Sequence, residues 1–320
     1  MGTTAQKLNK ILETKEAIRT AINNKGGTLT TTDTFASYPS AIDSLPSGGG
    51  GSLKTLLDAT KSTYFLFFNY SGTSIDGLIS YNDTENVTNM SYMFNNCSNL
   101  TTIPQLNTSN VTNMASMFNY CSNLTTIPQL NTSKVTTMNY MFSSCSKLTT
   151  ISQLDTSSVI DVSRMFQNCS NLTTIPQLNT SKVTNMSYMF QNCSNLTTIP
   201  QLDTSKVTNM HSIFDGCSKL TTIDITNMKI TNTSNSNSFA YNCKSLTKLI
   251  IRNMPTIPAI SSSAFTGCYH FTGTTDATYN PQGLKDGRIY VPDDKVDALK
   301  TATNWSTYAD IIVPLSTLVE

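Results

Sequence analysis

The sequence predicts an α/β solenoid of about eight stacked coils, each made of a short strand and a short helix. A repeat that runs through most of the chain supports this fold class. VTNMSYMFNNCSNLTTIPQLNTSN from Val87 recurs almost unchanged as VTNMSYMFQNCSNLTTIPQLDTSK from Val183. One cysteine marks each copy; the first six are 24 residues apart, and the last two gaps are 26 and 25. The eight are Cys97, Cys121, Cys145, Cys169, Cys193, Cys217, Cys243 and Cys268.

Each repeat carries two apolar patterns. Around Phe94 the apolar residues recur at steps of three and four, which predicts a short helix or tight turns. The segment LTTIPQL that follows Cys97 is short and β-branched, which predicts a brief strand. A single unit of this size cannot bury its apolar side, whereas stacked copies form one continuous core.

The two ends of a solenoid expose apolar surface and need caps. We therefore divide the repeat region into a front cap at residues 53–86, the repeats at 87–268 and a rear cap at 269–320. In the rear cap, GRIYVP predicts a strand, and Pro292 is suited to begin a helix that runs to Thr301. Trp305 is expected to pack on the last repeat.

A separate small module precedes the repeats. Residues 46–52, PSGGGGS, predict a flexible hinge, and residues 1–45 contain a predicted helix that ends near Gly26. Its heptad seam steps three and four residues in turn: Leu8, Ile11, Lys15, Ile18 and Ile22. Such a heptad seam predicts a homodimer or a homotrimer, or docking onto a larger particle.

Composition excludes several classes of partner. Only 13% of residues are charged and the net charge is +1, so no basic field for nucleic acid is expected. No apolar run approaches the ~18 residues that a membrane span needs. The first residues also lack the apolar segment of a signal peptide, so we expect folding in a cytoplasm.

The residues that carry most enzyme chemistry are scarce. Metal sites for zinc favour paired ligands such as C-x-x-C, which the chain lacks, so each cysteine is expected to be a buried core thiol. Nucleophilic catalysis needs a base beside the nucleophile, but His211 occupies a variable, exposed position of the repeat, and His270 is expected to pack near the rear cap. We therefore expect no enzyme, no cofactor and no metal.

Two sets of residues are candidate binding surfaces. The first is a hydroxyl- and amide-rich face that also has a structural interpretation, as cross-strand packing. It comprises Thr101, Thr102, Thr125, Thr126, Thr149, Thr150, Thr173, Thr174, Thr197, Thr198, Gln105, Gln129, Gln153, Gln177 and Gln201. The second is aromatic, with Arg164 and His211 nearby, and equally fits a cover for core residues. It comprises Tyr92, Tyr120, Tyr140, Tyr188 and Tyr241.

The motif L-x-x-I…V-x-x-M…M-F-x-x-C resembles the BspA-type leucine-rich repeats over Val87 to Cys268. The segment KLNKILETKEAIRTAINNKG…FASYPSAIDSL is similar to short N-terminal segments of bacteriophage tail and fibre proteins. Together these resemblances imply a bacteriophage virion fibre on a tail or capsid, assembled in the host cytoplasm. Its N-terminal module would bind other virion proteins, and its leucine-rich-repeat domain would bind a host-surface glycan or protein.

Two alternatives stay open. A BspA-like adhesin of the bacterial cell surface would use the same repeats for binding and would require a secretion signal. A structural virion decoration protein would bind only other virion parts.

Overall fold

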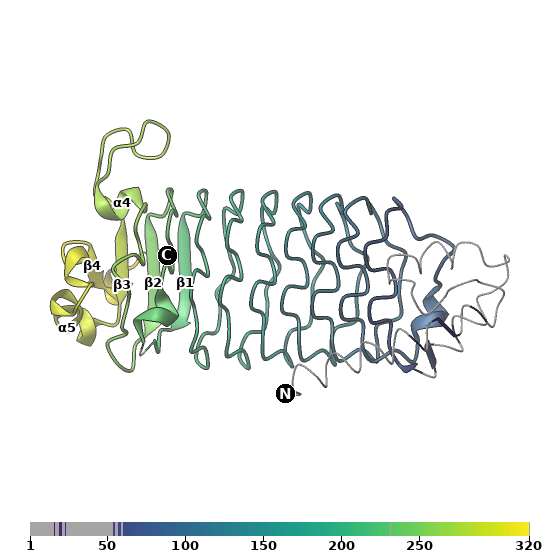
Figure 1. The fold of residues 1–320 in the computed structure, drawn as a ribbon. Helices are drawn as coiled ribbons and strands as arrows, with labels where there is room; N and C mark the ends of the chain where they lie inside the picture. Colours follow the sequence, from purple (N-terminus) through teal and green to yellow (C-terminus); the bar gives the residue numbers. More distant parts are fainter. Residues whose placement is uncertain are drawn as a thin grey trace.

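The chain forms an elongated stack of coils that ends in a small sheet and a helical cap (Figure 1). The computed structural model describes residues 61–230 and 232–319, together with eight isolated positions before residue 61. The predicted seam of Leu8, Ile11, Lys15, Ile18 and Ile22 lies outside the described residues. The coils follow one another along the axis, so equivalent positions of successive repeats form columns on the surface (Figure 1).

The stretch predicted to be a short helix is instead a chain of overlapping tight turns. Met93 N–H donates to Met90 O at 3.3 Å, and Cys97 N–H donates to Phe94 O at 3.2 Å. The third residue of each of these turns, Tyr92 or Asn96, has a φ near +60° (59° and 62°). A positive φ suits a type II turn and interrupts a right-handed helix. The prediction of a short helix was therefore wrong. The alternative that the same spacing predicted, a series of tight turns, is the structure that forms.

The turns also join each coil to the next. Phe94 N–H donates to Met117 O at 2.9 Å, and Tyr92 N–H donates to Ala115 O at 3.0 Å. The same bonds recur in later coils, for example from Phe142 N to Met165 O at 2.9 Å. Each coil thus satisfies its backbone groups partly within itself and partly through its neighbour, as a parallel pairing does.

The predicted strand of each repeat is correct only near the C-terminal end. Within the described residues, the LTTIPQL phase forms a regular strand in β1 (Thr222–Asn227) and β2 (Lys248–Asn253). Most earlier copies carry a proline, such as Pro104, which has no N–H for a ladder bond. Asp224 replaces that proline in β1, and the ladder forms there.

The sheet has four parallel strands in the order β1-β2-β3-β4, with β3 at Arg288–Val291 and β4 at Ile312–Pro314. Short helical segments complete the described part of the chain. They are η2 (Tyr81–Thr84), η3 (Thr233–Ser236), α4 (Tyr269–Thr272), η4 (Asp293–Lys295), α5 (Val296–Thr301), η5 (Ser306–Tyr308) and η6 (Leu315–Thr317). The predicted strand GRIYVP and the helix after Pro292 are confirmed.

The rear cap closes the core with aromatic side chains. Trp305 is fully buried, and its ring centroid lies 6.0 Å from that of Phe265 in the last repeat. Its indole N–H donates to Pro258 O at 2.8 Å. This contact confirms the expectation that Trp305 packs on the last repeat.

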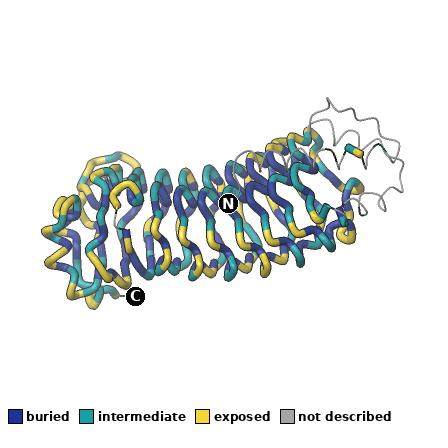
Figure 2. Tube along the Cα trace, turned by 60° about the horizontal axis from the view of Figure 1, so that its bottom comes forward, coloured by how far each residue is buried: buried dark blue, intermediate teal, exposed yellow. Residues whose placement is uncertain are grey.

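A ladder of phenylalanine rings runs through the interior, which is buried along the whole stack (Figure 2). Phe94 and Phe118 stack with centroids 5.5 Å apart and planes 7° apart. The stacking continues to Phe214 and extends back to Phe67, in the predicted front cap. Between Phe214 and Phe239 the rings turn to 83°, where the repeat length changes from 24 to 26.

The cysteines form a second internal ladder. All eight are free and buried, and each thiol lies beside a backbone carbonyl of the preceding coil. Cys145 Sγ–H donates to Phe118 O at 3.1 Å, and Cys169 Sγ–H donates to Phe142 O at 3.0 Å. The thiols therefore act as core groups that satisfy carbonyls, in agreement with the sequence prediction.

A polar groove on the solenoid surface

The predicted glutamine column is real, and its amide donors link successive coils. Gln153 Nε2–H donates to Gln177 O at 2.7 Å, and Gln177 Nε2–H donates to Gln201 O at 3.0 Å. Each of these amides also donates to the carbonyl of the leucine that follows it, at 3.2 Å. The side chains thus supply donors that this part of the backbone lacks because proline recurs in it.

The acceptor atoms of the same amides stay available. Within the described residues, no hydrogen bond reaches Oε1 of Gln153 or Gln177, and both side chains are exposed. The coils of Gln153 and Gln177 therefore each present one free side-chain amide oxygen, Oε1.

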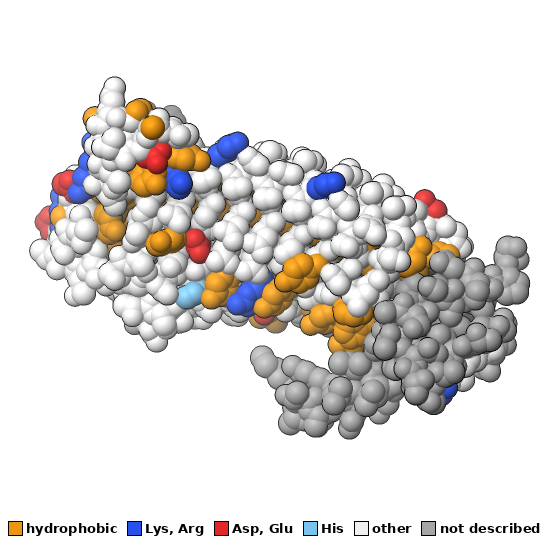
Figure 3. Space-filling view, turned by 45° about the horizontal axis from the view of Figure 1, so that its top comes forward, with side chains coloured by type: hydrophobic (Ala, Val, Ile, Leu, Met, Phe, Trp, Pro, Cys, Tyr) orange, Lys and Arg blue, Asp and Glu red, His pale blue; other side chains and the backbone are white. Residues whose placement is uncertain are grey.

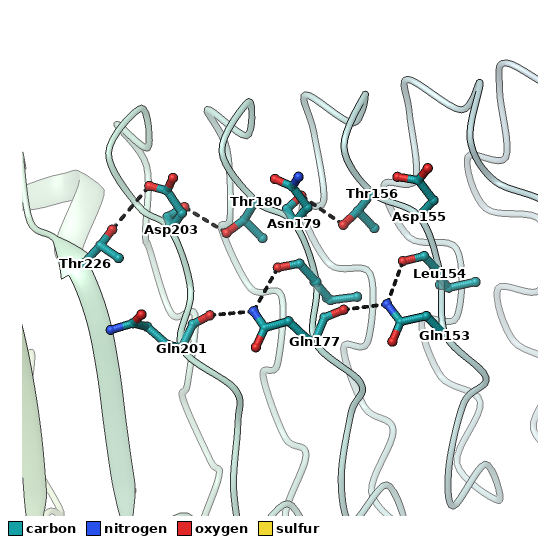
Figure 4. Close-up of a pocket in the computed structure, with 11 residues that line it drawn as sticks. Gln153, Leu154, Asp155, Thr156, Gln177, Asn179, Thr180, Gln201, Asp203 and Thr226 are labelled. Carbon is teal, nitrogen blue, oxygen red and sulfur yellow. Dashed lines mark hydrogen bonds between the residues drawn. The ribbon is translucent and has the colours of Figure 1, made fainter. Parts of the chain in front are cut away.

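A groove of about 700 Å³ runs beside this column and is lined by residues of four successive coils (Figure 4). Its other wall is a column of short polar residues: Asp155, Asn179 and Asp203. The buried Leu154 and Leu178 lie between the two walls. Figure 4 shows both walls with their side chains in register from coil to coil.

The second wall is built by local turns. Ser157 N–H donates to Asp155 Oδ1 at 2.9 Å, and Ser205 N–H donates to Asp203 Oδ1 at the same distance. Thr180, which is buried, donates from Oγ1 to Asp203 O at 2.8 Å and so fixes the neighbouring coil. The hydrogen bond from the serine two residues later therefore holds each acidic side chain in place.

The two carboxylates of the groove are charged at neutral pH. The hydrogen bond from Ser157 lowers the pKa of Asp155, and the hydrogen bond from Ser205 lowers that of Asp203. Neither forms an ion pair with a basic side chain among residues 61–230 and 232–319. The groove therefore combines fixed negative charge with free amide acceptors and is matched to a ligand rich in hydrogen-bond donors.

The threonine columns predicted to form a ligand face lie on the surface. All ten threonines of that set are exposed. Part of the first column donates to the preceding coil: Thr197 Oγ1–H donates to Thr173 O at 3.4 Å. The structure gives the second column, which includes Thr150 and Thr174, no such bond, so it adds exposed hydroxyls.

The structure divides the predicted aromatic face among three columns. Tyr92, Tyr140 and Tyr188 share one column, which is the first of two left-handed positions in each coil. Tyr120 stands at the second left-handed position and is 54% exposed. Tyr241 aligns with neither of these, because it occupies the position of Asp215 in the preceding coil. The five tyrosines of the predicted aromatic face therefore occupy three columns, and three of them share one.

Sequence reasoning missed the acidic wall of the groove. The signal was present, because the residue two places after each glutamine is always asparagine or aspartate: Asn107, Asn131, Asp155, Asn179 and Asp203. These residues line a groove only when the coils are stacked, because the glutamine column of the stacked coils forms the opposite wall.

These features define a leucine-rich-repeat type of solenoid with a polar groove on its surface. A family profile described as "Mycoplasma protein of unknown function, DUF285" matches residues 62–175 and 167–277, which is more than half of the chain. The chain belongs to this family. No curated protein sequence matches it.

Solved structures with a similar fold include bacterial leucine-rich repeat proteins. One from Eubacterium ventriosum has 22% identity, a TM-score of 0.40 and coverage of 57% of each chain. A leucine rich cell surface protein from Faecalibacterium prausnitzii has 19% identity and a TM-score of 0.21, covering 63% of this chain and 79% of that one. One from Bacteroides ovatus has 15% identity and a TM-score of 0.25, with 77% and 87% covered.

This chain thus spans 57% of the length of the Eubacterium protein. With similarities this low, function has to be argued from the residues of this chain. Among the described residues no helix is long and apolar enough to cross a membrane, and no group of three or more potential metal ligands occurs.

Proposed function

We propose that the chain is a non-catalytic binding module of the bacterial-surface type, whose groove holds a hydroxyl-rich, uncharged glycan. The observation that carries this proposal is the pairing of two acceptor walls. Gln153 and Gln177 offer free Oε1 atoms on one wall, and Asp155 and Asp203 offer charged carboxylates on the other. Neutral sugars are dense in O–H donors and complement such a surface.

The rigidity of the groove favours binding further. Every wall residue sits on a coil that is hydrogen-bonded to its neighbours, and the carboxylates are already oriented by their turns. A ligand therefore does not have to order these side chains, which lowers the entropic cost of binding. Hydrogen bonds to charged carboxylates are also stronger than those to neutral acceptors.

We place this binding module on a bacterial cell surface. A bacterial surface role follows the BspA-type alternative and agrees with the description of the Faecalibacterium protein as a cell surface protein. The virion fibre expectation depends on residues 1–45, of which only four isolated positions are described, and none of the comparisons supports it. Accessibility of the chain to antibody on intact source cells supports the surface role, and its recovery only in virus particles supports the fibre.

Binding is tested with an immobilised array of neutral and acidic oligosaccharides. We expect the full-length protein to retain a subset of neutral glycans, and the Asp155→Asn/Asp203→Asn variant to lose them. Asp76→Asn, an exposed carboxylate in the front cap, is the matched control and should bind as the unmodified protein does. Retention of the same glycans by the groove variant, or no retention by the unmodified protein, contradicts the proposal.

A further inference from the structure

The two left-handed positions of each coil carry different kinds of residue. The second position is mostly asparagine or glycine: Asn69, Asn96, Tyr120, Ser144, Asn168, Asn192, Gly216 and Asn242. These residue types adopt a positive φ at the lowest cost. The first position contains neither type and is more often large and planar than small: Phe65, Tyr92, Ser116, Tyr140, Arg164, Tyr188, Ser212 and Ser238. Backbone preference therefore does not account for the residues of the first position.

One part of this column forms a cation sandwich. The guanidinium carbon of Arg164 lies 5.1 Å from the ring centroid of Tyr140 and 4.2 Å from that of Tyr188. The ring of Tyr188 lies 4.8 Å from that of His211 in the next coil. Figure 3 shows a row of apolar, basic and histidine side chains along the lower edge of the visible face. The four residues are half-buried, so the sandwich is part of the surface.

The guanidinium of Arg164 has no acidic partner among residues 61–230 and 232–319, where no ion pair or side-chain hydrogen bond involves it. The carboxylate three residues earlier, Asp161, accepts a hydrogen bond from Ser163 N–H at 2.8 Å. Stacking between two rings stabilises the cation and fixes its plane without using its five N–H donors. The sandwich therefore holds the guanidinium N–H donors of Arg164 in a fixed orientation, and no carboxylate of residues 61–230 and 232–319 pairs with them.

His211 extends the same surface. Its Nδ1 lies 3.0 Å from Ser234 O, and because a carbonyl oxygen only accepts, this nitrogen carries the proton. The other ring nitrogen is left for a different partner. The column, with His211 beside it, thus offers phenolic hydroxyls, guanidinium N–H groups and one imidazole nitrogen.

The spacing of the column favours one class of anion carrier. Stacked coils repeat at about 4.8 Å, and the three successive coils that carry Tyr140, Arg164 and Tyr188 each present one of these polar edges. Side chains on one face of an extended peptide recur at roughly 6.6 Å, which falls out of step with the coils. Successive rings of a sugar chain are closer to the coil spacing. An acidic glycan therefore fits the column better than an acidic peptide does.

We propose that Arg164, held between Tyr140 and Tyr188, is a second binding site that takes the carboxylate of an acidic sugar residue. The guanidinium fork binds the carboxylate, and the flanking tyrosine hydroxyls contact the sugar. The site deepens the proposed function because it assigns a further glycan class to the same solenoid. It shares no residue with the groove, so the two can fail separately.

The test uses polygalacturonate, a uronic acid polymer, and its methyl-esterified form, in which the carboxylates are blocked. Binding of each to the full-length protein is measured by biolayer interferometry. We expect binding of the free acid and little binding of the ester. Arg164→Gln should weaken binding of the free acid by about tenfold or more, because a charge-assisted bidentate contact is lost. Tyr188→Ser, which places the residue of Ser116 and Ser212 at this position, should weaken it several-fold.

Two controls separate this site from general attraction and from the groove. Lys182→Gln removes an exposed positive charge outside the column and should leave binding unchanged. Asp155→Asn/Asp203→Asn should also bind polygalacturonate normally, and Arg164→Gln should keep any neutral glycan bound by the groove. Thermal unfolding verifies that each variant is folded. Absence of polygalacturonate binding, equal losses in Arg164→Gln and Lys182→Gln, or equal binding of polyglutamate overturns the proposal.

Discussion

Cys145 Sγ–H donates a hydrogen bond to Phe118 O at 3.1 Å, so a core side chain of one coil completes the backbone of the coil before it. The same relationship recurs from Cys97 to Cys268, with the carbonyl of a phenylalanine as acceptor in all but the last case. The thiols therefore link successive coils by hydrogen bonds, in addition to filling the core.

Replacing Cys145 by alanine should destabilise the solenoid. The change leaves a small cavity and removes one of the two hydrogen bonds that Phe118 O accepts, the other coming from Cys121 N–H at 3.0 Å, which together cost about 1–3 kcal/mol. Urea unfolding measures the free energy of unfolding. Thr150→Ala, at an exposed position, is the control and should change it by less than about 0.5 kcal/mol. Equal free energies of unfolding for the two variants would show that the thiols do not stabilise the contact between coils.

Alkaline pH should destabilise the chain through the same cysteines. Burial raises the pKa of Cys121, Cys145, Cys169, Cys193, Cys217, Cys243 and Cys268, and that of Cys169 to about 12. In the unfolded chain these thiols ionise near their ordinary pKa of 9.0. Above that pH the unfolded state binds fewer protons than the folded state, so the free energy of unfolding falls as pH rises.

Each buried thiol contributes a fall of about 1.4 kcal/mol per pH unit between its unfolded and folded pKa values. For Cys169 this window runs from about pH 9 to about pH 12. Stability measured across the lower part of this window should decline steeply for the unmodified protein, and less steeply for Cys169→Ala. Identical pH slopes in the two proteins would contradict this assignment.

Gly216 provides a test of the turn geometry. It has a φ of 75° at the second left-handed position, next to Asn192, whose amide donates to Asn168 at 2.9 Å. Gly216→Asn should extend this row and change stability by less than about 0.5 kcal/mol. Gly216→Val should cost more than about 1 kcal/mol, because a β-branched residue is strained at positive φ. Comparable urea midpoints for the two variants would argue against the turn geometry.

The core of this fold could be predicted from the sequence, because Phe94 and Cys97 recur at a fixed spacing that only stacking explains. Turns and a helix could not be separated, because both place Met90, Met93 and Phe94 on one side. The left-handed conformation of Tyr92 decides between them, and tyrosine gives no sign of it. Strands were predicted from β-branched residues, but Pro104 and its equivalents remove the donors that a ladder requires.

The candidate site could be predicted only in part. The glutamine column was identified, but the use of its amide N–H groups between coils became visible only when Gln153 and Gln177 were placed one above the other. The acidic wall depends on which residues of adjacent coils face each other. The sandwich of Arg164 arises for the same reason, since Tyr140 and Tyr188 lie 24 residues away on either side.

Assembly through the N-terminal seam remains a prediction. Ile11→Asp/Ile18→Asp in the full-length chain should convert a dimer or trimer into a monomer, because charge is placed in the predicted apolar seam. Light scattering on size-exclusion peaks measures the mass. Lys10→Asp, outside the seam, is the control and should keep the assembly. A monomeric unmodified protein would show that the seam serves a different partner.

The central claim is that the groove between the glutamine column and Asp155, Asn179 and Asp203 binds a neutral glycan. Isothermal titration calorimetry with a neutral oligosaccharide retained on the array tests it most directly. At neutral pH we expect saturable binding to the unmodified protein and to Asp76→Asn. The affinity of Asp155→Asn/Asp203→Asn should be about tenfold or more lower, because charge-assisted hydrogen bonds are lost. Equal affinities for the unmodified protein and the groove variant would contradict the claim.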